Sequence, residues 1–89
     1  MADISIEFAE LVETRADDLL GTIFSKLDKS MVAKSLKTID PKVSEKIFMN
    51  LSEEESNEIK NRMAGIIPID EVEAAQRQII EIINKKNIS

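Results

Sequence analysis

The chain has 89 residues, 43% hydrophobic and 33% charged, and its twelve basic and seventeen acidic side chains give a net charge of −5. This composition suits one small folded domain, because it is too apolar for a disordered tail and too charged for a membrane span. The chain has no cysteine, histidine, tryptophan or tyrosine, and this absence excludes disulfides, the usual zinc sites and an aromatic platform for stacking nucleic-acid bases. The net negative charge also repels nucleic acid.

The N-terminal segment, residues 1–15, contains a short predicted helix from about Ile4 to Val12, with Phe8 and Leu11 on its apolar face. A secretory signal would need a basic and then an apolar stretch here, but the first ten residues carry three acids. We therefore expect a cytoplasmic protein without a transmembrane segment. Residues 16–89 are predicted to form the main helical bundle, so that residues 1–89 make one domain.

Pairs of an apolar residue and a helix-capping residue mark four predicted helix starts: Leu27-Asp28, Ile39-Asp40, Leu51-Ser52 and Ile69-Asp70. The capping oxygen accepts hydrogen bonds from free backbone N–H groups, while the apolar residue can pack back on the helix. Pro41 suits a first helical position because its missing N–H needs no partner there. Ser52 with Glu55, and Asp70 with Glu73, have the spacing of a capping box.

Apolar residues at helical spacing predict one more helix, at about residues 16–27, and mark the buried faces of three of the helices above, over residues 31–39, 43–51 and 72–83. Gly21, inside the first of these, predicts the close approach of a neighbouring helix, and Gly65 before Pro68 predicts a helix end. No segment alternates as a strand does, and the short loops predict helical hairpins. The predicted fold class is all-α, a compact bundle or superhelix of about six short helices in armadillo-like hairpins.

The segment from Glu53 to Arg62 is different, because Ile59 is its only apolar residue. Its acids lie at the N-terminal end and Lys60 and Arg62 near the C-terminal end, which matches the helix macrodipole, and Glu58 can pair with Arg62 at i,i+4. This pattern fits an ordinary solvated helix, or a charged ridge offered to another protein. Exposed ionic contacts are each worth under about 1 kcal/mol, which suits an interaction that forms and releases repeatedly.

Residues 35–63, together with Pro68 and residues 71–83, resemble the C-terminal domain of the flagellar motor switch protein FliG. The family has a leucine-lysine pair, a Glu-Lys-aromatic/aliphatic stretch ending in Asn-Met-Ser, a charged helix, a Gly-Pro-Val turn and a final helix with a Val-Glu-x-x-Gln pattern. The matching positions here are Leu36-Lys37, residues 45–48, residues 50–52, residues 67–69, and Val72-Glu73 with Gln76. Residues 8–12 resemble the start of the family's domain.

The resemblance implies a rotor component at the cytoplasmic face of the inner membrane, in the flagellar basal body. There it would contact the switch protein FliM, other FliG copies in a ring, and the cytoplasmic loop of the stator protein MotA, without catalysis, cofactor or metal. Of the family's functional charges, the lysine is kept as Lys37, an arginine is replaced by Glu54, and two acids are replaced by Asn61 and Arg62. The predicted protein-binding residues are Lys37, Glu54, Glu58, Lys60, Asn61 and Arg62.

A second hypothesis is a stand-alone helical adaptor or regulatory domain without a torque role, either a FliG paralogue or a relative of the cytoplasmic domain of magnesium transporters. In the latter case Glu53, Glu54, Glu55 and Glu58 would bind a divalent ion. Solvation is the preferred reading of these acids, because hard cations need oxygens that converge from several elements. An enzyme is the least supported class, since no pair of acids is marked as buried or convergent.

Overall fold

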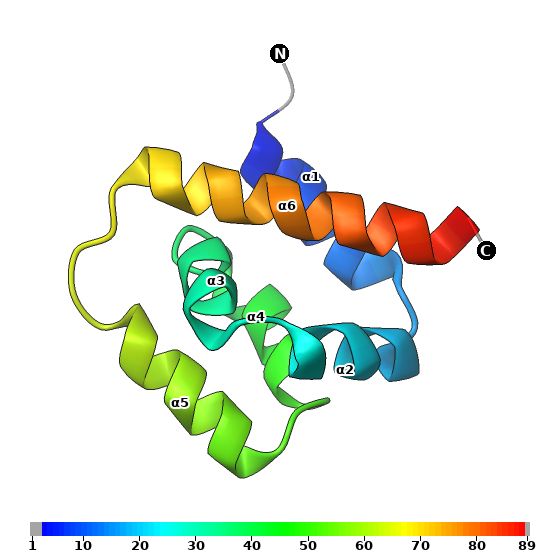
Figure 1. The fold of residues 1–89 in the computed structure, drawn as a ribbon, viewed down its shortest axis with the longest axis horizontal. Helices are drawn as coiled ribbons and strands as arrows, with labels where there is room; N and C mark the ends of the chain where they lie inside the picture. The colour runs from blue at the N-terminus through cyan, green and yellow to red at the C-terminus, as the bar shows by residue number, and fades with distance from the viewer. Residues whose placement is uncertain (1–2, 89) are drawn as a thin grey trace.

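The computed structural model describes the backbone of residues 3–88 and the side chains of residues 3–85. Within these residues the chain forms six α-helices and no strand (Figure 1), so the predicted all-α fold is confirmed. The helices are α1 (Ile4–Thr14), α2 (Asp17–Lys26), α3 (Lys29–Ser35), α4 (Pro41–Phe48), α5 (Glu53–Met63) and α6 (Ile69–Ile88).

Three of the four predicted helix starts are confirmed by their capping bonds. The carboxylates of Asp28 and Asp40 each accept a hydrogen bond from a backbone N–H of the first turn, at 3.2 and 2.9 Å, and Pro41 is the first residue of α4. Ser52 and Glu55 form a reciprocal capping box, with bonds of 3.0 and 3.1 Å. These starts depend only on residues close in sequence, which is why the pattern predicts them correctly.

The predicted cap at Asp70, and its capping box with Glu73, are wrong. Helix α6 begins one residue earlier, at Ile69, and the carbonyl of Pro68 accepts two N–H groups of the first turn at 3.0 and 3.2 Å. A residue before a helix needs only a free carbonyl to receive the first helical hydrogen bonds, so Pro68 can take that position. Asp70 then lies inside the first turn, where its charge favours the positive end of the helix dipole.

Helix α3 is shorter than predicted, since it ends at Ser35 and not near Ile39. The chain continues in a tight turn, in which the N–H groups of Lys37 and Ile39 donate to carbonyls three residues earlier, at 3.2 and 3.3 Å. This turn bends the chain away from the helix axis and leaves Asp40 at a φ of −54° and a ψ of 132°, outside the helical region, where it caps α4. Helix α4 likewise ends at Phe48, before the predicted end at residue 51.

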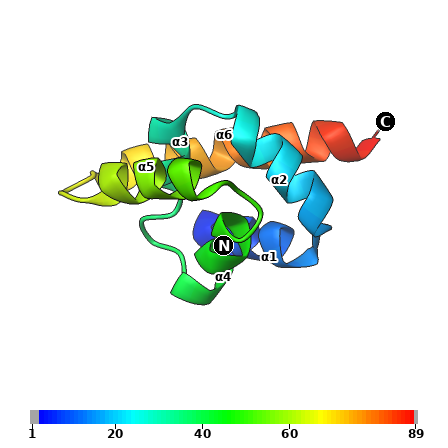
Figure 2. The ribbon, with the colours of Figure 1, turned by 90° about the horizontal axis from the view of Figure 1, so that it is seen from below.

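The core forms between helices that are not consecutive in the chain. The most extensive contacts join α3 with α5, α3 with α6, α1 with α6, α1 with α4, and α2 with α4. Figure 2 shows α4 beside α1, with α5 beside α3 in another part of the molecule. Consecutive helices are therefore not the main packing pairs expected of hairpins, because their apolar faces turn towards more distant partners. The predicted core face of α6 is confirmed, and its buried residues include Val72, Ala75, Ile79, Ile80 and Ile83.

Gly21 marks a close approach, as predicted, although the neighbour is the turn after α4. A Cβ atom at Gly21 would lie 2.9 Å from the carbonyl oxygen of Asn50. That is shorter than real Cβ atoms tolerate, so only glycine lets α2 pack against this turn.

Candidate protein-binding surface

Helix α5 is held through a narrow strip and leaves a broad polar face exposed. Ile59 is fully buried, Ser56 beside it is 7% exposed, and Met63 at the end of the helix is partly buried. The prediction that Ile59 anchors this helix is therefore confirmed. We call the exposed face the α5 ridge, and it consists of Glu53, Glu54, Asn57, Glu58, Lys60, Asn61 and Arg62.

The first turn of α5 is tied to the start of α3 by Glu55. The ammonium of Lys29 lies 3.6 Å from the Glu55 carboxylate, which also accepts from the backbone N–H of Ser52. The backbone hydrogen bond from Ser52 is the main cause that lowers the pKa of Glu55, and the Ser52 side chain and the Lys29 charge lower it further. Glu55 is therefore a structural acid at this end of the helix.

The last turn of α5 carries the ion pair predicted from the spacing. The guanidinium of Arg62 lies 3.2 Å from the Glu58 carboxylate and donates to the Ser30 hydroxyl on α3 at 2.7 Å. Both members of the pair are about half exposed, so the pair itself contributes only a few tenths of a kcal/mol. Its larger effect is to hold two opposite charges at a defined place on the surface.

Lys60 is also held in place, by the aromatic ring of Phe48 at the end of α4. Its ammonium nitrogen lies 5.0 Å from the ring centroid, and an exposed contact of this kind is worth about 0.5–1 kcal/mol. In contrast, the exposed side chains of Glu54 and Asn61 have no hydrogen bond or ion pair within the described part of the chain. These two polar groups are available to a partner without breaking any contact.

The structure brings most of the predicted binding residues onto one face. Glu54, Glu58, Asn61 and Arg62 recur at helical spacing along α5, and Lys60 lies on the flank of the same helix. Lys37 comes from the turn after α3, and its ammonium donates to the carbonyl of Met63, the last residue of α5. Four of the six predicted residues therefore share one face of α5, Lys60 lies on its flank, and Lys37 lies at its C-terminal end.

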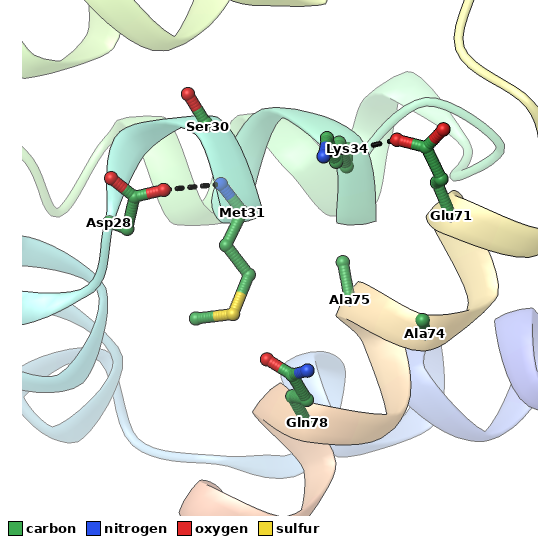
Figure 3. A pocket seen from close by; sticks show the side chains of 8 residues that line it. All are labelled: Asp28, Ser30, Met31, Lys34, Glu71, Ala74, Ala75 and Gln78. Carbon is green, nitrogen blue, oxygen red and sulfur yellow. Dashed lines mark hydrogen bonds and ion pairs between the residues drawn. The ribbon is translucent and has the colours of Figure 1, made fainter.

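Two hollows, of which the second borders this surface at Asn61 and Arg62, were not predicted from the sequence. One, of about 330 Å³, lies between α3 and α6, with Met31 reaching from α3 towards α6 and an ion pair of 3.1 Å between Lys34 and Glu71 (Figure 3). The other, of about 360 Å³, lies between α3, the end of α5 and the loop before α6, where Ile66 is 99% exposed. Both arise where segments distant in the chain meet, so no local pattern marks them.

Gln76 joins α6 to α1, α3 and the turn after α3, and this structural role was not predicted beyond its match to the family pattern. Its side chain is fully buried, and its amide nitrogen donates to the Ser35 carbonyl at 2.9 Å and to the Thr38 hydroxyl at 3.1 Å. Its amide oxygen accepts from the Ser5 hydroxyl at 3.0 Å. The one usable signal is its position, four residues after Val72 on the apolar face of α6, where a polar residue needs buried partners.

Comparison with known proteins finds a matching family and two related sequences. Residues 3–87 match the sequence model of the family described as "FliG C-terminal domain". The chain is 32% identical over 71 residues to the flagellar motor switch protein FliG of Borreliella burgdorferi, an alignment that covers 78% of this chain and 21% of that protein. It is also 32% identical over 82 residues to the flagellar motor switch protein FliG of Vibrio cholerae, covering 90% of this chain and 23% of that protein.

The chain spans less than a quarter of the length of these curated relatives. No solved structure gives a significant match. In the described part of the chain, no helix combines the length and the hydrophobicity of a membrane span. The family match over nearly all residues decides the assignment, and this chain belongs to the FliG C-terminal domain family.

Proposed function

We propose that this chain is a component of the flagellar motor switch, which transmits torque and changes of rotational direction through contacts of the α5 ridge with a stator protein. The observation that carries the proposal is the arrangement of α5, which has one fully buried apolar side chain and seven exposed polar or charged ones. The family membership supports the same role. The expected partner is the cytoplasmic loop of MotA.

The ridge acts by electrostatic contact, and no covalent bond is made or broken. Each exposed ion pair is worth under about 1 kcal/mol, so stator contacts can form and release at every step of rotation. Such charges steer the encounter more than they supply affinity, and their effect decays over about 10 Å at moderate salt. Charges that each contribute a weak interaction therefore suit repeated contact and release better than an apolar surface that binds tightly.

The charges of this ridge differ from the family pattern, which leads to a proposal about the partner. Glu54 stands where the family has an arginine, and Asn61 and Arg62 stand where it has two acids. A stator loop that fits this ridge would carry a basic group opposite Glu54 and an acid opposite Arg62. We propose a stator that has diverged together with this domain.

The remaining partners of the proposal follow from the family as well. The domain would contact the switch protein FliM and neighbouring FliG copies in a ring, at the cytoplasmic face of the inner membrane. A magnesium-binding role is less favoured, since Glu53, Glu54 and Glu58 all lie on exposed faces of a single helix and their oxygens do not converge from several elements. An adaptor without a torque role is the main alternative.

Reversal of two ridge charges tests the proposal. The double variant Lys60→Glu, Arg62→Glu is expected to weaken binding to the MotA loop and to impair motility, while the free energy of unfolding changes by no more than about 1 to 2 kcal/mol, because both sites are exposed. The matched control is Lys26→Glu, Lys42→Glu, which makes the same change in net charge at exposed positions of α2 and α4.

Loss of stator binding in the ridge variant alone supports the torque role. Equal losses in both variants would point to net charge alone and contradict a specific ridge. Normal stator binding and normal swimming by a folded ridge variant would favour the adaptor alternative.

A further inference from the structure

The C-terminal end of α5 has few hydrogen bonds within the helix itself. The last four carbonyls of a helix have no partner within it, and the cap residue Ala64 makes only a long hydrogen bond of 3.4 Å, to the carbonyl of Asn61. The chain then passes through Gly65, at a φ of 98°, and reaches an exposed isoleucine, Ile66. No buried residue follows α5 directly, so the last turn depends on contacts with other elements.

Lys37 supplies one of these contacts. Its backbone lies in the turn that follows α3, and its ammonium donates to the carbonyl of Met63, 26 residues later in the chain. A lysine at this place both satisfies a free carbonyl and neutralises the negative end of the helix dipole. The contact of Arg62 with Ser30 holds the same turn from the side of α3.

The fold uses the same device at another helix end. Lys46 of α4 donates to the carbonyls of Glu13 and Arg15, at 2.8 and 3.1 Å, and so closes the C-terminal end of α1. In both places a lysine from one element covers the carbonyl end of a helix that is far away in sequence. Each lysine can make this contact because the fold places its side chain within reach of the carbonyl, which a positive charge elsewhere on the surface would not be.

We infer that Lys37 is a positioning residue for the α5 ridge. Lys37 affects stator binding by holding the last turn of α5, and it is not itself a charge that contacts the stator. By holding the Met63 carbonyl it keeps Lys60, Asn61 and Arg62 in fixed positions. This inference rests on the proposed function for the identity of the partner. The placement of the last turn by Lys37 is independent of that function.

Three variants separate position from charge. Lys37→Met removes all donors, whereas Lys37→Arg keeps donors that can reach a carbonyl. Lys42→Met makes the same change in net charge at an exposed lysine that has no side-chain partner within the described residues. Amide hydrogen exchange, followed residue by residue by NMR, is measured at Met63 and Ala64, with the core amide of Ile79 as a check that the chain is folded.

Exchange at Met63 and Ala64 is expected to be about five-fold faster in Lys37→Met, and within about two-fold of the parent in Lys37→Arg and Lys42→Met. The Ile79 amide should be unaffected in all three. If the Met63 and Ala64 amides exchange at the same rate in Lys37→Met as in Lys42→Met, the inference is overturned. The carbonyl carbon shift of Met63, which reports on hydrogen bonding at that oxygen, should change in Lys37→Met alone.

A double-mutant comparison tests the effect on the partner. Binding to a peptide of the MotA cytoplasmic loop is measured at about 50 mM and about 300 mM salt for the parent, for Lys37→Met, for the double variant Lys60→Met, Arg62→Met, and for the variant with all three changes. A positioning role acts through the charges of Lys60 and Arg62, so Lys37→Met should weaken binding of the parent but not of the double variant that lacks those charges. A contact charge predicts the same factor of loss in both backgrounds, and that result would overturn the inference.

Failure of the proposed function would look different. A parent chain that does not bind the stator loop at either salt concentration contradicts the proposed partner, and with it the effect of Lys37 on that partner. The exchange measurement would still decide whether Lys37 holds the last turn of α5.

Discussion

The side-chain amide of Gln76 donates to the backbone carbonyl of Ser35 at 2.9 Å, and both residues are fully buried. This bond joins α6 to the last residue of α3, the helix that also packs against α5. The same amide group bonds Thr38 in the next turn and Ser5 on α1. One glutamine thus connects three parts of the chain that have no sequence proximity.

Replacing this glutamine should destabilise the domain. Gln76→Leu is expected to lower the free energy of unfolding by about 1–3 kcal/mol, because the buried Ser35 carbonyl is left without its partner. Urea denaturation measures the effect. Gln78→Leu, at an exposed position of the same helix, is the control and should change stability by no more than about 0.5 kcal/mol. Equal effects of the two substitutions would show that the buried bonds contribute little.

Ile59, the one fully buried apolar side chain of α5, should be essential for the attachment of this helix. Ile59→Ala is expected to cost about 2–5 kcal/mol of stability, because Ile59 is fully buried and truncation leaves a cavity. Thermal unfolding measures the loss. Ile66→Ala provides the control, since Ile66 is 99% exposed and should contribute almost nothing. A loss below about 1 kcal/mol at Ile59 would mean that Met63 and the polar contacts are enough to hold α5.

The close approach at Gly21 gives a prediction opposite to helix propensity. Alanine is better than glycine by about 1 kcal/mol in a helix interior, but a Cβ atom at this site would lie 2.9 Å from the Asn50 carbonyl oxygen. Gly21→Ala is therefore expected to destabilise the domain by about 1–3 kcal/mol in urea denaturation. Ser25→Ala, at an exposed position of α2, should be close to neutral. A stabilised Gly21→Ala variant would show that the turn after α4 can move aside.

The acid at the start of α5 should make stability depend on pH. The hydrogen bond from the Ser52 N–H, helped by the Ser52 side chain and by Lys29, lowers the pKa of Glu55 in the folded state. An acid with a lowered folded pKa stabilises the fold above its unfolded pKa, about 4.3 for glutamate, and loses that contribution as pH falls through the folded value.

The measurement is the urea midpoint of the parent and of Glu55→Gln between about pH 7 and about pH 2. The parent should be the more stable at neutral pH, and the difference should shrink below about pH 4. Glu54→Gln, which removes an exposed acid without a partner, is the control. A difference that does not vary with pH would mean that the ionised form of Glu55 gives no stability.

The local features of this protein could be predicted from the sequence, because they depend on residues within one helical turn. The caps at Asp28, Asp40 and Ser52 and the pair of Glu58 with Arg62 involve neighbours two to four residues apart. The exposure of α5 followed from its composition, since Ile59 and Met63 are its only apolar residues and most of its other side chains are polar or charged. The exact start of α6 was missed because a proline carbonyl replaced the expected side-chain cap.

The partners of each helix were decided only by the tertiary structure. Hydrophobic spacing indicates which face of a helix is buried, but it does not say against which other face, and here the main contacts skip over the next helix in the chain. The contacts that hold the ridge, from Lys37 to Met63, from Arg62 to Ser30 and from Lys60 to Phe48, join residues from 12 to 32 positions apart. Such contacts form only when the core has brought the backbones together, because a side chain reaches a few ångströms and carries no information about distant segments.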